Sequence, residues 1–101
     1  MAYRNTQPVR QTDVASEPGT AVSVGTTSTV IAAANPDRVE ITITNDHATQ
    51  ILYLKLAGAA AEANKGIRVN AAGGSYTTNA YTGEIRGIAS GATTPVLVVE
   101  I

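Results

Sequence analysis

The stretch of sequence that decides the fold reads Arg38-Val-Glu-Ile-Thr-Ile-Thr-Asn-Asp-His-Ala-Thr-Gln-Ile-Leu-Tyr-Leu-Lys-Leu56. In its first part Val39, Ile41 and Ile43 share one face, because successive side chains of a strand point to opposite sides. The opposite, solvent-facing side holds Arg38, Glu40, Thr42 and Thr44. The second part, residues 51–56, is apolar on most of both faces, which is typical of a strand inside a sheet. Turn-forming residues lie between the two parts, so we predict a β-hairpin.

Short β-branched and apolar runs continue this pattern in both directions. A break at Asn35-Pro-Asp37 separates the hairpin from the strands before it, since Pro36 cannot donate to a ladder. The last run is apolar on both faces up to Glu100, so we expect it in the middle of a sheet. Besides the hairpin, the expected strands are residues 21–24, 28–32, 66–70, 75–79, 84–90 and 96–101.

Three further segments carry local signals. Residues 57–66 are rich in Ala, which favours a helix, but so short a helix is marginal in isolation, and we expect a long loop with at most one helical turn. The Gly73-Gly74 pair predicts a hairpin turn. Gly87 lies in mid-strand, where a missing side chain marks a bulge or a close approach.

About eight short strands at this spacing predict an all-β fold. We expect an antiparallel two-sheet β-sandwich over residues 20–101, with jelly-roll and Ig-like connectivity both open. Residues 1–19 are polar and interrupted by prolines, and we interpret them as an extended N-terminal arm. This arm is either a disordered terminus or a segment that orders against a neighbouring subunit, and docking would then bury Tyr3, Val9 and Val14.

Composition disfavours several classes of partner. The chain of 101 residues has a formal net charge of -1 and only 15% charged residues. It offers no basic field for nucleic acid and no polybasic patch for a membrane surface. No apolar signal region or long apolar span is present, so we expect neither Sec export nor membrane insertion. The lack of Cys rules out disulfides and thiolate ligands and suits a protein made in a reducing cytoplasm.

The sequence offers little for catalysis. His47 lies beside Asp46 in the predicted turn, and the pair could act as a base and its orienter, but no motif such as Gly-x-Ser-x-Gly accompanies it. A solvated turn histidine is the simpler interpretation. The carboxylates place no two acids on one strand face, as glycosidase chemistry would need. We therefore predict no enzyme, no cofactor and no metal site.

Tyrosines are the only aromatic residues of the chain. Sugar-binding sandwiches stack pyranose rings on aromatic faces, but the lack of Trp weakens a carbohydrate-binding interpretation. Tyr76 and Tyr81 flank an expected bend near residues 79–83. There they either cover the open end of the sandwich or contact another subunit.

Four motifs follow one another in a distinctive order: Asn35-Pro-Asp-Arg-Val-Glu-Ile-Thr-Ile-Thr-Asn45, Ile51-Leu-Tyr-Leu-Lys-Leu56, Ala72-Gly-Gly-Ser-Tyr76 and Tyr81-Thr-Gly-Glu-Ile-Arg-Gly-Ile-Ala89. This order resembles that of small virion proteins of tailed bacteriophages, over about residues 20–101. The resemblance implies a structural role on the capsid surface of the virion, as a head decoration or cement protein. It also implies two partners: the major capsid protein, and further copies of the chain in a homotrimer.

The alternative is a phage tail or fibre component, or a β-sandwich module that binds a host receptor or glycan. A small, nearly neutral sandwich with an arm is compatible with the cement role, because many weak repeated contacts can hold a lattice together.

Overall fold

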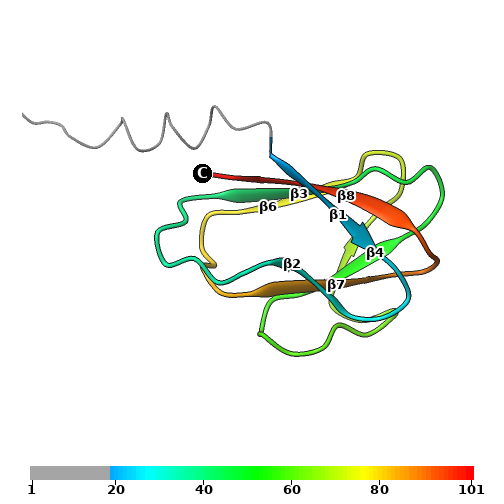
Figure 1. The fold of residues 1–101 in the computed structure, drawn as a ribbon, viewed down its shortest axis with the longest axis horizontal. Coiled ribbons are helices and arrows are strands. Elements are labelled where there is room, and N and C mark those ends of the chain that lie inside the picture. The colour runs from blue at the N-terminus through cyan, green and yellow to red at the C-terminus, as the bar shows by residue number, and fades with distance from the viewer. Residues whose placement is uncertain (1–18) are drawn as a thin grey trace, which may run out of the picture.

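The computed structural model describes residues 19–101, so Tyr3, Val9, Val14 and the predicted arm up to residue 18 lie outside the described residues. The described part folds into two four-stranded antiparallel sheets (Figure 1). The all-β, two-sheet sandwich predicted from the sequence is thereby confirmed. Within residues 19–101, no helix is long and apolar enough to cross a membrane. The strands are β1 (Thr20–Val24), β2 (Thr29–Ala32), β3 (Ile41–Asn45), β4 (Leu52–Lys55), β5 (Ile67–Val69), β6 (Ser75–Thr78), β7 (Ile85–Ala89) and β8 (Thr94–Glu100).

The strand order is β1-β8-β3-β6 in one sheet and β2-β7-β4-β5 in the other. First and last strands pair, and so do β2 with β7, β3 with β6 and β4 with β5, each time antiparallel. The chain is therefore one long hairpin that folds over on itself, which is the connectivity of a jelly roll. Figure 1 shows the two layers, with β3, β6 and β8 in the upper one and β2 and β7 in the lower one.

The predicted hairpin over residues 38–56 is wrong. β3 lies between β8 and β6, whereas β4 lies between β7 and β5 in the other sheet. The hairpin predicted at Gly73-Gly74 is wrong in the same way, because β5 and β6 also belong to different sheets. The inward faces of β3 and β4 are both apolar and contribute to the same buried core, while their ladder partners come from distant parts of the chain.

The core between the sheets is aliphatic. The predicted central positions are confirmed, since β4 lies between β7 and β5, and β8 between β1 and β3. Gly87 shows the predicted close approach, because a Cβ there would lie 2.3 Å from Cδ1 of Ile31, next to a register shift in β2. The largest fully buried apolar side chains are Ile41, Ile43, Leu52, Leu54, Ile85, Val24, Val69 and Val96.

The β4–β5 connection is a loop, as expected, and we call residues 56–66 the cover loop. It crosses the outer face of the β2-β7-β4-β5 sheet, because the amide of Ala61 donates to Oγ of Ser28, next to β2, at 2.9 Å. The Tyr53 hydroxyl, on β4, donates to Oδ1 of Asn64 in the loop at 3.0 Å. Tyr53 is only 7% exposed although it points away from the core, so the cover loop shields this face.

Candidate functional site

The outer face of the β1-β8-β3-β6 sheet differs from the face beneath the cover loop, because its central strand exposes large apolar side chains. Leu97 and Val99 of β8 are 40% and 42% exposed. We call this surface the open face. Strand alternation and the ladder registers assign to it Ala21, Ser23, Thr42, Thr44, Ser75, Thr77, Pro95, Leu97 and Val99.

The register arranges these side chains in rows across the strands. Leu97 lies between Ala21 on β1 and Thr44 on β3. Val99 lies opposite Thr42, whose hydroxyl hydrogen-bonds the hydroxyl of Thr77 at 2.9 Å. The open face is thus an apolar ridge along β8, flanked by small and hydroxyl-bearing side chains that are available to a partner's backbone.

Charge is distributed unequally between the two outer faces. The strand residues assigned to the open face are uncharged, and Glu40 and Asp46 follow the same alternation directly before and after β3. Four cations of residues 19–101 lie instead on the opposite sheet or in the cover loop. These are Lys55, Lys65, Arg68 and Arg86. Charged side chains are costly to desolvate, whereas burying exposed apolar side chains against another protein is favourable.

A shallow pocket on the charged face is lined by Lys55, Glu62, Lys65 and Gly66. Its volume of about 60 Å³ is well below the roughly 300 Å³ or more of ordinary small-molecule pockets. Lys65 donates to Glu62 at 3.0 Å and holds the pKa of that carboxyl below its usual range, so this pair compensates itself and Lys55 is the remaining cation of the pocket. The open face is therefore the better candidate for function.

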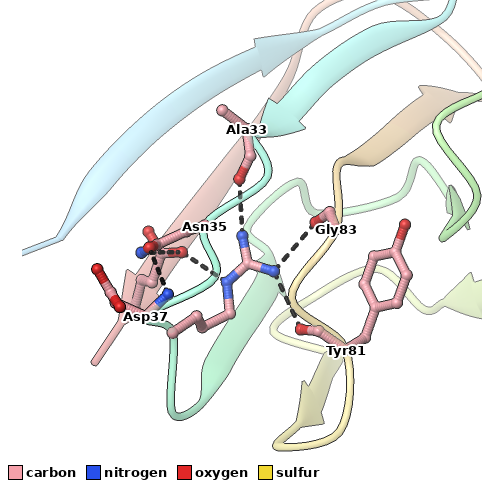
Figure 2. Close-up of polar contacts among 7 residues, drawn as sticks. Ala33, Asn35, Asp37, Tyr81 and Gly83 are labelled. Atoms are coloured by element: carbon pink, nitrogen blue, oxygen red, sulfur yellow. Dashed lines mark hydrogen bonds and ion pairs between the residues drawn. The ribbon is translucent and has the colours of Figure 1, made fainter.

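A buried arginine lies near the end of β8. Figure 2 shows the polar contacts at this place, with Ala33, Asn35, Tyr81 and Gly83 labelled. Arg38, expected on the solvent-facing side of its strand, has a side chain that is only 1% exposed. Its Nε donates to Oε2 of Glu100 at 2.5 Å. The other guanidinium nitrogens donate to the carbonyl oxygens of Ala33 at 2.9 Å and of Tyr81 and Gly83 at 3.1 Å.

This network joins three segments that are distant in the sequence: the β2–β3 connection, the β6–β7 connection and the end of β8. Asn35 adds a hydrogen bond from its Nδ2 to Glu100 at 3.3 Å. Because Glu100 directly follows Val99, the network fixes the position of the open-face ridge. The prediction that Arg38 faces solvent is wrong, since the ends of strands can turn inward where a polar network accepts them.

A second polar network lies at the other end of β3. Asn45 is fully buried, and its Nδ2 donates to the carbonyl oxygens of Gln50 at 2.8 Å and Val69 at 3.2 Å. Its Oδ1 accepts the amide of His47, and Nδ1 of His47 accepts the amides of Thr49 and Gln50, all at 3.0 Å. A neutral His47 therefore carries its proton on Nε2 and serves to hold the turn.

The two predicted contact residues that the structure describes, Tyr76 and Tyr81, do not belong to the open face. Tyr76 lies opposite Ile43 in the ladder, and it packs against the core. Tyr81 also packs against the core, and its hydroxyl donates to the carbonyl oxygen of Glu84 at 2.9 Å. Their role in subunit contacts stays a prediction, as does that of the residues before position 19.

Sequence reasoning missed the open face. The signal was present, because the last strand is apolar on both faces, but it was interpreted only as a central position in a sheet. Among the residues that the structure describes, no three His, Cys, Asp or Glu side chains are placed to hold a metal ion. Comparisons with protein-family models, curated proteins and solved structures return no match.

Proposed function

We propose that this protein is a non-enzymatic structural component of a tailed-phage virion, a decoration or cement protein that stabilises the head through subunit contacts. The observation that carries the proposal is the open face, where Leu97 and Val99 are exposed on an uncharged sheet. Such a surface suits contact with protein. The phage assignment itself comes from the order of motifs quoted above.

The two-sided character of the molecule supports a place on a larger assembly. One outer face carries cations and a cover loop, and the other presents apolar and hydroxyl groups. Jelly rolls also occur in viral capsid proteins, as they do in lectins and cupins. This likeness is an analogy of fold, which bears on architecture and leaves function to the surface.

The size of the open face favours repeated weak contacts. Four strands about 4.8 Å apart, each with about five residues at 3.4 Å, cover roughly 300 Å². A specific single contact buries about 800 Å² per partner. A homotrimer bound to the major capsid protein would multiply weak contacts through its valency, without a strong contact at any one point.

Particles that lack the protein test the proposal. We expect such heads to break at lower temperature than complete ones and still to adsorb to cells, and added purified protein to restore heat resistance. Leu97→Glu should fail to restore it, because a buried unpaired charge is costly in any contact. Val30→Glu is the matched control, since Val30 is 38% exposed on β2 of the other sheet.

Two results would contradict the cement function. Heads that stay robust while adsorption is lost would overturn the cement function and identify a tail, fibre or receptor-binding module. Heat resistance that is unaffected by both removal and addition of the protein would also overturn the proposal.

A further inference from the structure

The N-terminal segment enters the described structure at the edge of the open face. β1 is an edge strand of that sheet, and its first residue, Thr20, pairs with Val98. A Cβ at Gly19 would lie 2.6 Å from the carbonyl oxygen of Val98 and 3.1 Å from Cγ2 of Val99. Gly19, the first described residue, therefore lies beside the exposed Val99, at one end of the apolar ridge.

The length of this segment exceeds what its own open face can accept. Eighteen extended residues reach up to about 60 Å, whereas four strands span less than about 20 Å. Folded back on its own sheet, the segment would cover the face with the residues nearest Gly19, and Tyr3 and Val9 would extend beyond the far edge. The open face of a second copy of the chain lies farther away, so the whole N-terminal segment is needed to reach and cross it.

The open face is also too small for two copies to form a specific interface by packing these faces alone. Two faces of roughly 300 Å² each bury about 600 Å², below the approximately 1,000 Å² expected of a specific interface. An exchanged segment adds its own surface, including Tyr3, Val9 and Val14. The side chains of residues 1–18 include two Arg and two acidic residues and sum to no net charge, which suits the uncharged strand residues of the open face.

The cover loop shows how this fold shields a sheet with a laid-down segment. There, a stretch of eleven residues is held by one buried alanine, Ala61, and by single hydrogen bonds to Ser28 and Tyr53. The open face offers the same kind of partners in the hydroxyls of Thr42, Thr44 and Thr77. The outer edge of β1 adds backbone groups that an extended segment can pair with.

We propose that residues 1–18 of a second copy lie across the open face, so that subunits assemble by exchanging their N-terminal segments. The exchange closes into a symmetric dimer or trimer, since each copy gives one segment and receives one. This inference deepens the proposed function, which requires self-contacts without saying which surfaces make them. Its test nevertheless uses the free protein alone.

Cysteine cross-linking tests the exchange, because the natural chain has no Cys and each introduced thiol is the only one. A Val14→Cys chain is mixed with a Leu97→Cys chain under mild oxidation and run on a non-reducing gel. We expect a disulfide-linked pair of chains, formed at least several-fold faster than with Val30→Cys as the partner. Val30 is the matched control because its exposure, 38%, is close to the 40% of Leu97.

The double variant Val14→Cys/Leu97→Cys separates exchange from self-coverage. Exchange predicts cross-links between chains at all working concentrations, and light scattering should show the wild-type mass above that of one chain. Deleting residues 1–18 should lower the mass to that of one folded chain, with the β-type circular dichroism unchanged.

Four results would overturn the exchange: cross-links only within one chain, equal rates for Leu97→Cys and Val30→Cys, a monomeric wild-type chain, or dominant Leu97–Leu97 disulfides. The last would mean that bare faces pack together. Exchange without any effect of the protein on head stability would leave this inference standing and remove only the cement function.

Discussion

Nε of Arg38 lies 2.5 Å from Oε2 of Glu100, which ties the entry of β3 to the end of β8 across 62 positions of sequence. The two side chains differ in burial and in the number of their hydrogen-bond partners. The Arg38 side chain is 1% exposed and also serves three carbonyl oxygens, whereas the Glu100 side chain is 32% exposed. The arginine therefore connects the segments at this end of the sandwich, and the carboxylate is one of its four hydrogen-bond acceptors.

Replacing the arginine should be far more damaging than replacing its acidic partner. Arg38→Met removes the donor of three carbonyl oxygens and leaves the Glu100 carboxylate with the longer hydrogen bond from Asn35. We expect the free energy of unfolding to fall by about 3 kcal/mol or more. Glu100→Gln keeps an oxygen acceptor, and we expect a loss of about 1 kcal/mol. Urea denaturation followed by circular dichroism measures both. Equal losses would mean that the charge pair, and not the carbonyl contacts, stabilises this end.

Asn45 gives a prediction with a pH signature. Asn45→Asp has nearly the same shape but cannot donate to both Gln50 and Val69, so the buried carboxylate would face two carbonyl oxygens. Burial and this repulsion raise the pKa of the new Asp in the folded state above its unfolded value. The folded variant then binds more protons than the unfolded one, and its stability falls as pH rises.

We expect Asn45→Asp to lose about 3 kcal/mol relative to the natural chain at pH 7, and less at pH 4. Denaturation curves of both chains at the two pH values measure the difference. Asn45→Ala, which removes the same hydrogen bonds without introducing an ionisable group, serves as the control. Its loss should be the same at the two pH values. A pH-independent loss for Asn45→Asp would show that the site admits water.

The strands and their faces could be predicted because side-chain alternation is a local property. Ile41 and Ile43 are buried as their period requires, and Gly87 makes room for Ile31 as a mid-strand glycine should. The prediction that Val39 shares their inward face is wrong, because Val39 precedes β3 and is 39% exposed. The pairing of the strands could not be predicted in this way, since β3 pairs with β6 and β8 and not with the next strand in sequence, β4. Alternation specifies which face is apolar, while the choice of sheet depends on how all eight strands fill one core.

The candidate site was less accessible to sequence reasoning for the same reason. Val99 is apolar like its buried neighbour Val98. Within residues 19–101, a covering segment lies over the Tyr53 face and none lies over the open face, which also lacks the cations of the Tyr53 face. Arg38 looked solvent-exposed because alternation places it with Glu40. Its burial depends on three loops that meet only in the folded chain.

Two glycines in the left-handed region offer a matched pair of variants. Gly66 has φ +86° and Gly73 has φ +93°, so alanine is strained by a similar amount at both. At Gly66 a Cβ would also lie 2.2 Å from the carbonyl oxygen of Leu54, whereas at Gly73 nothing lies within 4 Å. We expect losses of about 1 kcal/mol for Gly73→Ala and at least about 2 kcal/mol for Gly66→Ala. Thermal unfolding measures both, and equal losses would mean that the chain shifts away from Leu54 at little cost.

The cover loop should open more readily than the sandwich unfolds, because few side chains hold it down. Tyr53→Phe removes the hydrogen bond to Asn64 and keeps the buried ring, so we expect the free energy of unfolding to fall by only about 1 kcal/mol. Lys65 lies in the same loop and is exposed. Trypsin should therefore cleave after Lys65 several-fold faster in the variant, since local opening determines the rate at an exposed loop.

Ser28→Ala and Tyr76→Phe complete this test. Ser28→Ala removes the acceptor for the amide of Ala61 at the other anchor of the loop, and it should accelerate the same cleavage. Tyr76→Phe makes the same chemical change on β6, in the other sheet, and should leave the rate at Lys65 unchanged. If the rate in Tyr53→Phe rises only in proportion to global unfolding, the loop and the sandwich open as one unit. The cover loop would then be an integral part of the fold, and the contrast between a covered and an open face would be a permanent feature of the molecule.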